Sequence, residues 1–236
     1  MLAEHDIPAN SGLFLKDVQA PNTFRYELLD FIAEQMPHWR DTPGREQVTS
    51  ETNLTEQLCS HLNSAARFTD GWNCLQFIPE AGDEAGKGRK IDIAAKPCGA
   101  VITVEGRPHT HFDILLPIEC KRLPAPDDKS HEEREYVFCH HSTRGGIQRF
   151  KNGHHGAAHK LVGMIGYVQE GSLEDWYTKV SAWIDDLAAA GEDGWSSADK
   201  LTYETSATKI GRYASIHTRK NELEDVSVRH LWICLN

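Results

Sequence analysis

The segment FDILLPIECKRL, residues 112–123, decides how this chain is interpreted. Its first half is an almost unbroken apolar run, which is typical of a strand covered on both faces. Side chains alternate between the two faces of a strand, so Glu119 and Lys121 share one face while Cys120 points to the other. Two residues of strand rise separate the backbones of Glu119 and Lys121 by roughly 6.5 Å, so both side chains can address one group.

The pattern KIDIAA, residues 90–95, predicts a second short strand, and the linker between the two strands has the pattern of a β-hairpin. Ile91 and Ile93 occupy one face of this strand, so Asp92 projects to the opposite face. Bringing Asp92 beside Glu119 would concentrate negative charge in a half-buried place, which is costly unless a cation neutralises it. Oxygen ligands favour Mg2+, with Mn2+ as a substitute, over zinc.

These residues resemble the PD-(D/E)xK nuclease superfamily, whose pattern is an acid on one strand and acid-x-Lys on the next. Asp92, Glu119 and Lys121 match that pattern position by position, although Ile91 stands where the family name has proline. The resemblance implies an α/β protein, a restriction-endonuclease-like three-layer α/β/α sandwich with a mixed central sheet. It also implies that Asp92, Glu119 and the backbone carbonyl of Cys120 hold the metal, and that Lys121 orients or deprotonates the attacking water.

The activity that this resemblance implies is Mg2+-dependent hydrolysis of phosphodiester bonds, most readily in DNA. Restriction or antiphage defence is the role that it suggests for a single-domain nuclease of this size, with repair or recombination as alternatives. Nucleic acid is the expected partner, and a homodimer or a partner in a defence or repair complex is consistent with it. A different class of function also stays open, a binding or assembly subunit that keeps the nuclease fold and acts through a partner protein.

The same family usually carries a further acid on a helix that precedes these strands. Residues 50–66 have leucines at helical spacing, and Ser50 is the predicted N-cap. At about 100° per residue, Glu51 projects onto the centre of the apolar stripe, and Glu56 lies about 140° away on the solvent side. We therefore expect Glu51 to join the catalytic and metal-binding residues. A first-turn glutamate favoured by the helix dipole is the alternative explanation.

Residues 136–169 contain no acidic side chain, although the 236-residue chain carries a formal net charge of −10. If residues 143–152 form a helix, Arg144, Gln148 and Lys151 share one face and are expected to contact phosphates. Arg149 diverges from that face and is a further candidate for nucleic-acid binding. An ordinary solvated helix face explains the same spacing, and two adjacent glycines weaken the helix prediction.

Histidines and cysteines raise the alternative of a zinc site. The histidines of the acid-free segment are His140, His141, His154, His155 and His159, with Cys139 beside them. Their spacing is not that of a tight zinc module. The six cysteines of the chain show no C-x-x-C pair, so reduced thiols and a cytoplasmic location are expected. No signal peptide and no membrane span are expected either.

The length of 236 residues is sufficient for one full core. Residues 1–48 are expected to be an N-terminal helical addition packed on the core, and residues 49–236 a nuclease-like domain with its motif core at 51–169. Trp176 and Trp183 fit the apolar stripe of a helix over residues 172–190, so we expect them in the core rather than in base stacking. Residues 212–219 and 226–235 alternate like two strands. Pro117 indicates a bulge or an edge position in its strand.

Overall fold

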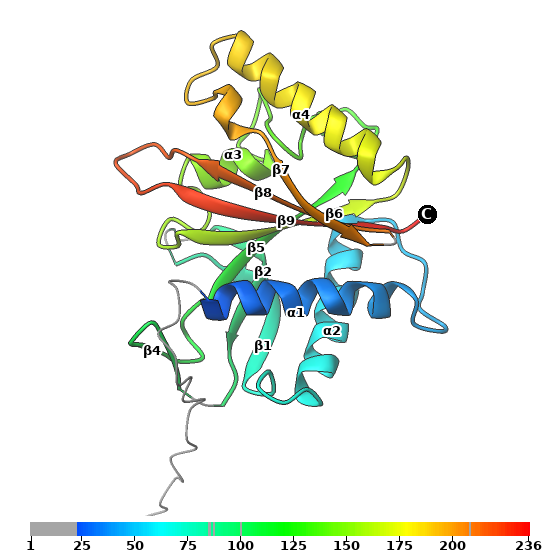
Figure 1. Ribbon diagram of the computed structural model, residues 1–236, viewed down its shortest axis with the longest axis vertical. Helices are drawn as coiled ribbons and strands as arrows, with labels where there is room; N and C mark the ends of the chain where they lie inside the picture. Colours follow the sequence, from blue (N-terminus) through cyan, green and yellow to red (C-terminus); the bar gives the residue numbers. More distant parts are fainter. Residues whose placement is uncertain (1–22, 85, 87, 100, 208) are drawn as a thin grey trace, which may run out of the picture.

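A seven-stranded sheet crosses the middle of the computed structural model, which describes residues 23–84, 86, 88–99, 101–207 and 209–236 (Figure 1). Its strands are β1 (Leu75–Gly82), β2 (Lys90–Pro97), β5 (Leu116–Leu123), β6 (Leu161–Val168), β7 (Thr202–Ala207), β8 (Ile210–His217) and β9 (Val226–Cys234). Their order is β1-β2-β5-β6-β9-β8-β7. The pairs β5–β6 and β6–β9 are parallel and the other neighbouring pairs are antiparallel, so the predicted α/β class with a mixed sheet is confirmed.

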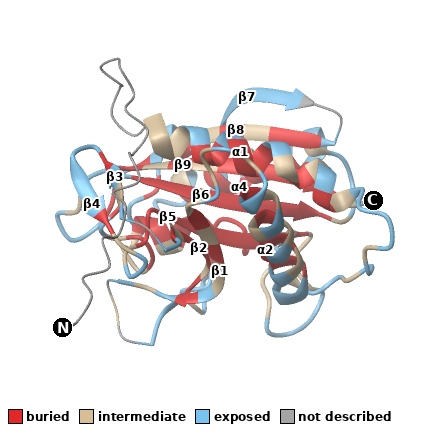
Figure 2. Ribbon diagram, turned by 90° about the horizontal axis from the view of Figure 1, so that it is seen from below, coloured by how far each residue is buried: buried red, intermediate tan, exposed pale blue. Residues whose placement is uncertain are grey.

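Helices cover both faces of this sheet. The helices α1 (Thr23–Arg40) and α2 (Glu51–Arg67) share one hydrophobic core with the first face. The short α3 (Gly146–Lys151) and the longer α4 (Leu173–Ala189) pack in a second core on the other face, and Figure 1 shows α4 across the sheet from α1 and α2. The central strands β5, β6 and β9 are buried between these layers, whereas β7 is exposed at the edge (Figure 2).

The structure confirms the features from which the helices were predicted. The Ser50 side chain accepts a hydrogen bond from the backbone of Asn53 and caps α2, as predicted. Trp176 and Trp183 on α4 are 6% and 8% exposed, so their placement in the core is confirmed. The helix α1 packs against the same core as α2, and residues 1–22 of the expected N-terminal addition lie outside the described residues. No helix in the described part of the chain is long and apolar enough to cross a membrane.

The linker between the two motif strands contains the predicted hairpin. Its strands β3 (Ile102–Val104) and β4 (Arg107–His109) form a separate two-stranded antiparallel sheet. The strand β1 before β2 was not predicted, although it pairs with β2 along seven residue pairs. The C-terminal strand pair is confirmed as β8 and β9, which are joined antiparallel.

The edge position expected from Pro117 is wrong, because β5 lies in the interior of the sheet between β2 and β6. Pro117 is opposite Ala94 of β2, and the parallel pairing with β6 begins only at Ile118. The residue that lacks an N–H therefore precedes the part of β5 that is hydrogen-bonded on both sides. Pairing with β2 is also short, and it ends at Ile93 opposite Ile118.

A chain of hydrogen bonds joins six buried polar side chains on the α3 and α4 side of the sheet. In order they are Trp232, Tyr136, His230, Ser215, His217 and Asp199. Although burial raises the pKa of Asp199, hydrogen bonds from His217 and Lys151 hold it well below its ordinary value, so the carboxylate accepts from His217 Nδ1. His217 Nε2 then accepts from Ser215, and His230 Nε2 donates to Ser215. Every donor finds an acceptor when both histidines are neutral.

Candidate active site

The candidate active site lies where β2 and β5 separate. Beyond the last pair, Ile93 with Ile118, the next residues along the two strands are Asp92 and Glu119. The Asp92 carboxylate accepts a hydrogen bond from the backbone N–H of Cys120 at 2.7 Å, so a side chain of β2 takes an N–H from β5 where backbone pairing has stopped. The Cys120 side chain lies on the α2 side, beside the Tyr167 hydroxyl at 3.7 Å, as the alternation predicts.

Glu119 is completely buried and surrounded by positive or N–H-bearing groups. Lys121 Nζ lies 3.1 Å from its carboxylate, His155 Nδ1 lies 2.9 Å away, and Arg149 forms a close ion pair with it. Burial alone would raise the pKa of Glu119, but the charge of Lys121, the hydrogen bond from His155 and the charge of Arg149 lower it to about 2. Glu119 is therefore a stable anion whose charge is balanced inside the protein.

Lys121 connects three of the expected site residues. Its Nζ lies 3.0 Å from the Glu51 carboxylate, 3.0 Å from the backbone oxygen of Cys120 and 3.1 Å from Glu119. Burial opposes its charge, but Glu119, Glu51 and Asp92 together raise the pKa of Lys121 well above its ordinary value. In this arrangement the side chain stays an ammonium. As an ammonium it can orient a water molecule and stabilise negative charge.

Glu51 joins this site through the start of α2. Besides Lys121, its carboxylate accepts the backbone N–H of Arg122 at 3.2 Å. Glu51 and Asp92 both line a small cavity of about 30 Å³, which is room for one water molecule or small ion. Glu56 lines the same cavity although its side chain is exposed as expected, so position relative to Lys121 distinguishes Glu51 from Glu56.

The oxygen donors at this cavity fit a hard divalent cation in their chemistry. Burial and the nearby charge of Glu119 raise the pKa of Asp92 to about 8, which marks a carboxylate that lacks sufficient positive charge. The distances between these oxygen donors do not match a metal site. Among the described residues, no three His, Cys, Asp or Glu side chains converge closely enough to hold a metal ion as they stand.

Two of the expected phosphate contacts are corrected by the structure. Gln148 and Lys151 are buried, 8% and 3% exposed, because α3 turns this face toward the interior. The Gln148 amide bonds the backbone of Cys139, and Lys151 Nζ lies 2.5 Å from Asp199. Both side chains are hydrogen-bonded within the protein, so neither lies on a solvated helix face where it would contact a phosphate.

Arg144 and Arg149 differ in what they reach. The helix α3 begins at Gly146, so Arg144 precedes it and is exposed. A Cβ at Gly146 would lie 2.8 Å from the Tyr136 carbonyl, so glycine is needed for close packing at a position that weakened the helix prediction. Arg149 points to Glu119, which places it in the site rather than on an outer helix face.

The histidines do not gather around one centre. His155 contacts Glu119, His159 lies 3.4 Å from Glu84, and His140 lies 3.2 Å from Glu132. Each pairs with a different carboxylate, which is unlike a zinc site. His155 is the site residue that sequence reasoning missed. The signal that was available is that Glu119, on a strand predicted to be buried, needs a partner, and that the acid-free segment after it contains His155.

A second group of residues has the arrangement of a catalytic triad but is buried. Ser215, His217 and Asp199 are hydrogen-bonded in the order of a serine hydrolase triad, at 2.7 and 2.6 Å. Ser215 is only 3% exposed, and its hydroxyl also contacts His230 at 2.8 Å. The hydroxyl therefore cannot reach a substrate, and this group serves the interior.

Comparisons of the chain with models of known protein families, with curated proteins and with solved structures found no match.

Proposed function

We propose that this protein is a Mg2+-dependent nuclease that hydrolyses phosphodiester bonds, with DNA as its substrate. The observation that carries the proposal is the meeting of Glu51, Asp92, Glu119 and Lys121 where β2 and β5 separate. Asp92, Glu119 and Lys121 match the strand motif, which does not include Glu51. Glu51 comes from the helix α2 and still lies beside Lys121. The two basic side chains at Glu119 add positive charge where a phosphate would bind.

We further propose that the fold is restriction-endonuclease-like. Its support is the order of elements around the site: α2 carries Glu51, β2 carries Asp92, β5 carries Glu119 and Lys121, and α3 and β6 follow. This is the succession that the resemblance implies, with the helical acid first and a helix and strand after the acid-x-Lys motif. A role in restriction or antiphage defence is proposed on the same resemblance.

In the proposed reaction, Asp92, Glu119 and the carbonyl of Cys120 would hold the metal, with Glu51 beside them. A divalent ion held there would neutralise charge and lower the pKa of a water molecule. Lys121 orients the attacking water and stabilises the negative charge that grows on the phosphoryl oxygens. Arg149, which pairs with Glu119 in the free protein, binds a phosphate oxygen of the substrate. Glu51 and Glu119 keep Lys121 protonated and fix its position.

The test uses purified protein with plasmid, linear and single-stranded DNA and with RNA, each with Mg2+, Mn2+ or EDTA. We expect cleavage of DNA with either metal. Lys121→Ala and Asp92→Ala should each lower the rate at least about 100-fold, the usual cost of removing a group that stabilises transition-state charge. Lys129→Ala, which changes an exposed loop lysine, is the matched control and should cleave like the wild type. Equal cleavage by all these variants would show that the site is wrong.

One observation favours a second candidate, the non-catalytic binding or assembly subunit. Glu119 is wholly buried, its charge is already balanced by Lys121 and Arg149, and it has a hydrogen bond with His155, so it has no need of a metal in this arrangement. Calorimetry separates the two. No heat with millimolar Mg2+ or Mn2+, together with stable association with a partner protein, would favour the binding subunit. Metal binding that Asp92→Asn removes would favour the nuclease.

A further inference from the structure

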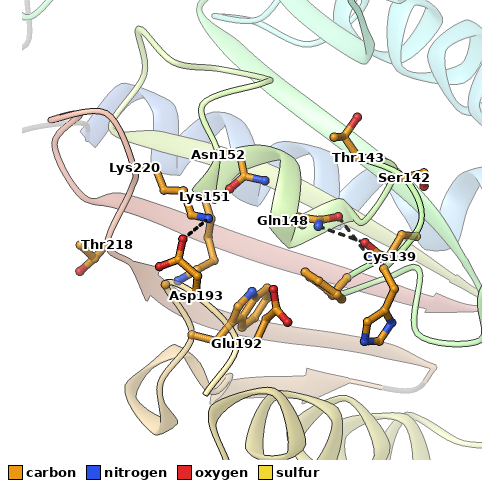
Figure 3. Close-up of a pocket in the computed structure, with 14 residues that line it drawn as sticks. Cys139, Ser142, Thr143, Gln148, Lys151, Asn152, Glu192, Asp193, Thr218 and Lys220 are labelled. Atoms are coloured by element: carbon orange, nitrogen blue, oxygen red, sulfur yellow. Dashed lines mark hydrogen bonds and ion pairs between the residues drawn. The ribbon is translucent and has the colours of Figure 1, made fainter. Parts of the chain in front are cut away.

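A cavity of about 370 Å³ lies on the α3 side of the sheet, apart from the small cavity at Asp92 (Figure 3). Its floor is made by the buried side chains of Phe138, Gln148 and Trp195. Exposed Thr143 and Thr218 stand at its rim. The volume is within the range of pockets that enclose a small organic molecule.

The helix α3 contributes residues both to this cavity and to the candidate active site. Gln148 and Arg149 are neighbours on α3, yet Gln148 lines the cavity and Arg149 pairs with Glu119. The two are also linked through Thr143, a rim residue whose carbonyl accepts a hydrogen bond from Arg149 Nε at 3.1 Å. A helix is about 10 Å across with its side chains, so a nucleotide close to the scissile phosphate lies within reach of the cavity.

The charges around the cavity disfavour an anion. Lys151 is paired with Asp199, and Lys220 is paired with Asp193 at 2.8 Å, as the dashed line in Figure 3 shows. Glu192 also lines the cavity. Of the four charged side chains that line the cavity, both ammonium groups are therefore already paired with a carboxylate, and among the described residues Glu192 has no ion pair. A phosphate would be repelled, whereas an uncharged polar ring with an amino group would be attracted.

The remaining lining suits a flat heteroaromatic ring. The rings of Phe138 and Trp195 meet edge to face, with centroids 6.1 Å apart, and Lys151 Nζ lies 4.9 Å from the Trp195 ring centre and fixes that side chain. Side-chain amides and hydroxyls of the wall, including those of Asn152 and Thr218, can hydrogen-bond the edge of a base. Aromatic surface together with edge-reading polar groups is how proteins hold unstacked bases.

We propose that this cavity receives a nucleobase turned out of the substrate strand, with the exocyclic amino group of adenine or cytosine directed at Glu192. The inference rests on the proposed nuclease function, because the strand is delivered by binding at the active site, to which α3 also contributes. Turning the base out requires its unpairing and unstacking, which cost a few kcal/mol and are least for single-stranded substrate.

The ligand chemistry is tested first without DNA. Adenosine, cytidine, thymidine and inorganic phosphate are titrated into the full chain by calorimetry, with no divalent metal. Adenosine and cytidine should bind more tightly than thymidine, and phosphate should not bind. Thr218→Trp, which fills the rim, should weaken nucleoside binding at least tenfold, and Thr205→Trp, at an exposed threonine of β7, should leave it unchanged. Glu192→Gln should reduce the preference over thymidine. Binding of phosphate in place of nucleosides, or of no nucleoside, overturns the proposal.

The strand is tested with oligonucleotides that carry 2-aminopurine, whose fluorescence rises when it leaves the stack. In EDTA, where the proposed nuclease is silent, wild type and Thr205→Trp should raise this fluorescence, and Thr218→Trp should not. DNA cleavage by wild type without any rise in fluorescence overturns the base pocket and leaves the nuclease function standing. Nucleoside binding that Thr218→Trp blocks, in a protein that cleaves no nucleic acid, overturns the proposed function and supports the pocket.

Discussion

The Glu119 carboxylate lies 2.9 Å from Nδ1 of His155, and both side chains are buried. Since Glu119 is ionised, His155 donates this hydrogen bond. Replacing His155 with alanine leaves a buried charge with one partner fewer, so His155→Ala should lower the free energy of unfolding by about 1–3 kcal/mol. Urea denaturation measures the change. His154→Ala is the matched control, because His154 is the neighbouring, half-buried histidine. An equal effect of both substitutions would contradict this role of His155.

Asp92→Asn should stabilise the metal-free protein while it removes activity. The substitution keeps the acceptor for the Cys120 N–H and removes a charge that burial and Glu119 disfavour, as the pKa of about 8 indicates. A gain on the order of 1–3 kcal/mol is expected at neutral pH. Thermal unfolding with and without Mg2+ measures it. Mg2+ should raise the Tm of wild type and have no effect on the variant, because a ligand stabilises only a state that binds it. A less stable variant would contradict the account.

Stability should fall as the pH drops below about 6.5, the ordinary pKa of histidine. Burial lowers the pKa of His217 and, more strongly, that of His230. The folded state therefore holds both neutral, and the stabilisation is complete above the unfolded pKa and is lost as the pH falls beneath it. Each histidine contributes a slope of up to about 1.4 kcal/mol per pH unit. Urea unfolding between pH 7.5 and 5 measures this slope. His230→Gln should reduce it, while His111→Gln, at an exposed site, should not.

Lys151→Met should reduce stability, whereas Arg144→Ala should reduce only DNA binding. Lys151 is paired with Asp199 in the interior, and removing one partner of a buried pair costs about 3–5 kcal/mol of stability. Arg144 is exposed, so Arg144→Ala should leave stability unchanged and weaken DNA binding. Losing one phosphate contact reduces the slope of log K against log salt concentration by about 1. Anisotropy titrations at several salt concentrations measure it. Loss of stability in Arg144→Ala, or loss of only DNA affinity in Lys151→Met, would reverse the assignment.

The core of the candidate site was accessible from the sequence because its signals are local. Strand alternation places Glu119 and Lys121 on one face, and helical spacing with an N-cap places Glu51 at the start of α2. Arg149 and His155 could not be assigned in this way. Their roles depend on where a six-residue helix ends and on which buried carboxylate needs a partner, and both are set by tertiary packing.

The errors have the same physical origin. Spacing alone put Lys151 on a solvated face, but Asp199, which pairs with it, is 48 positions away in the sequence. Pro117 indicated an edge because an interior strand is expected to be hydrogen-bonded on both sides along its whole length. In the structure, β5 gains its parallel neighbour only after the proline. Such contacts between distant segments leave no periodic mark in the chain.

The early end of the pairing between β2 and β5 sets a limit on how this protein can be stabilised. The N–H of Cys120 can serve either the sheet or the carboxylate of Asp92, since it has one hydrogen to donate. Extending the ladder by one more pair would strengthen the sheet and at the same time take away the group that positions Asp92. A substitution that adds a backbone hydrogen bond here would therefore stabilise the sheet and remove the hydrogen bond that positions Asp92. In any stabilised variant, the incomplete pairing of β2 and β5 should be kept as it is.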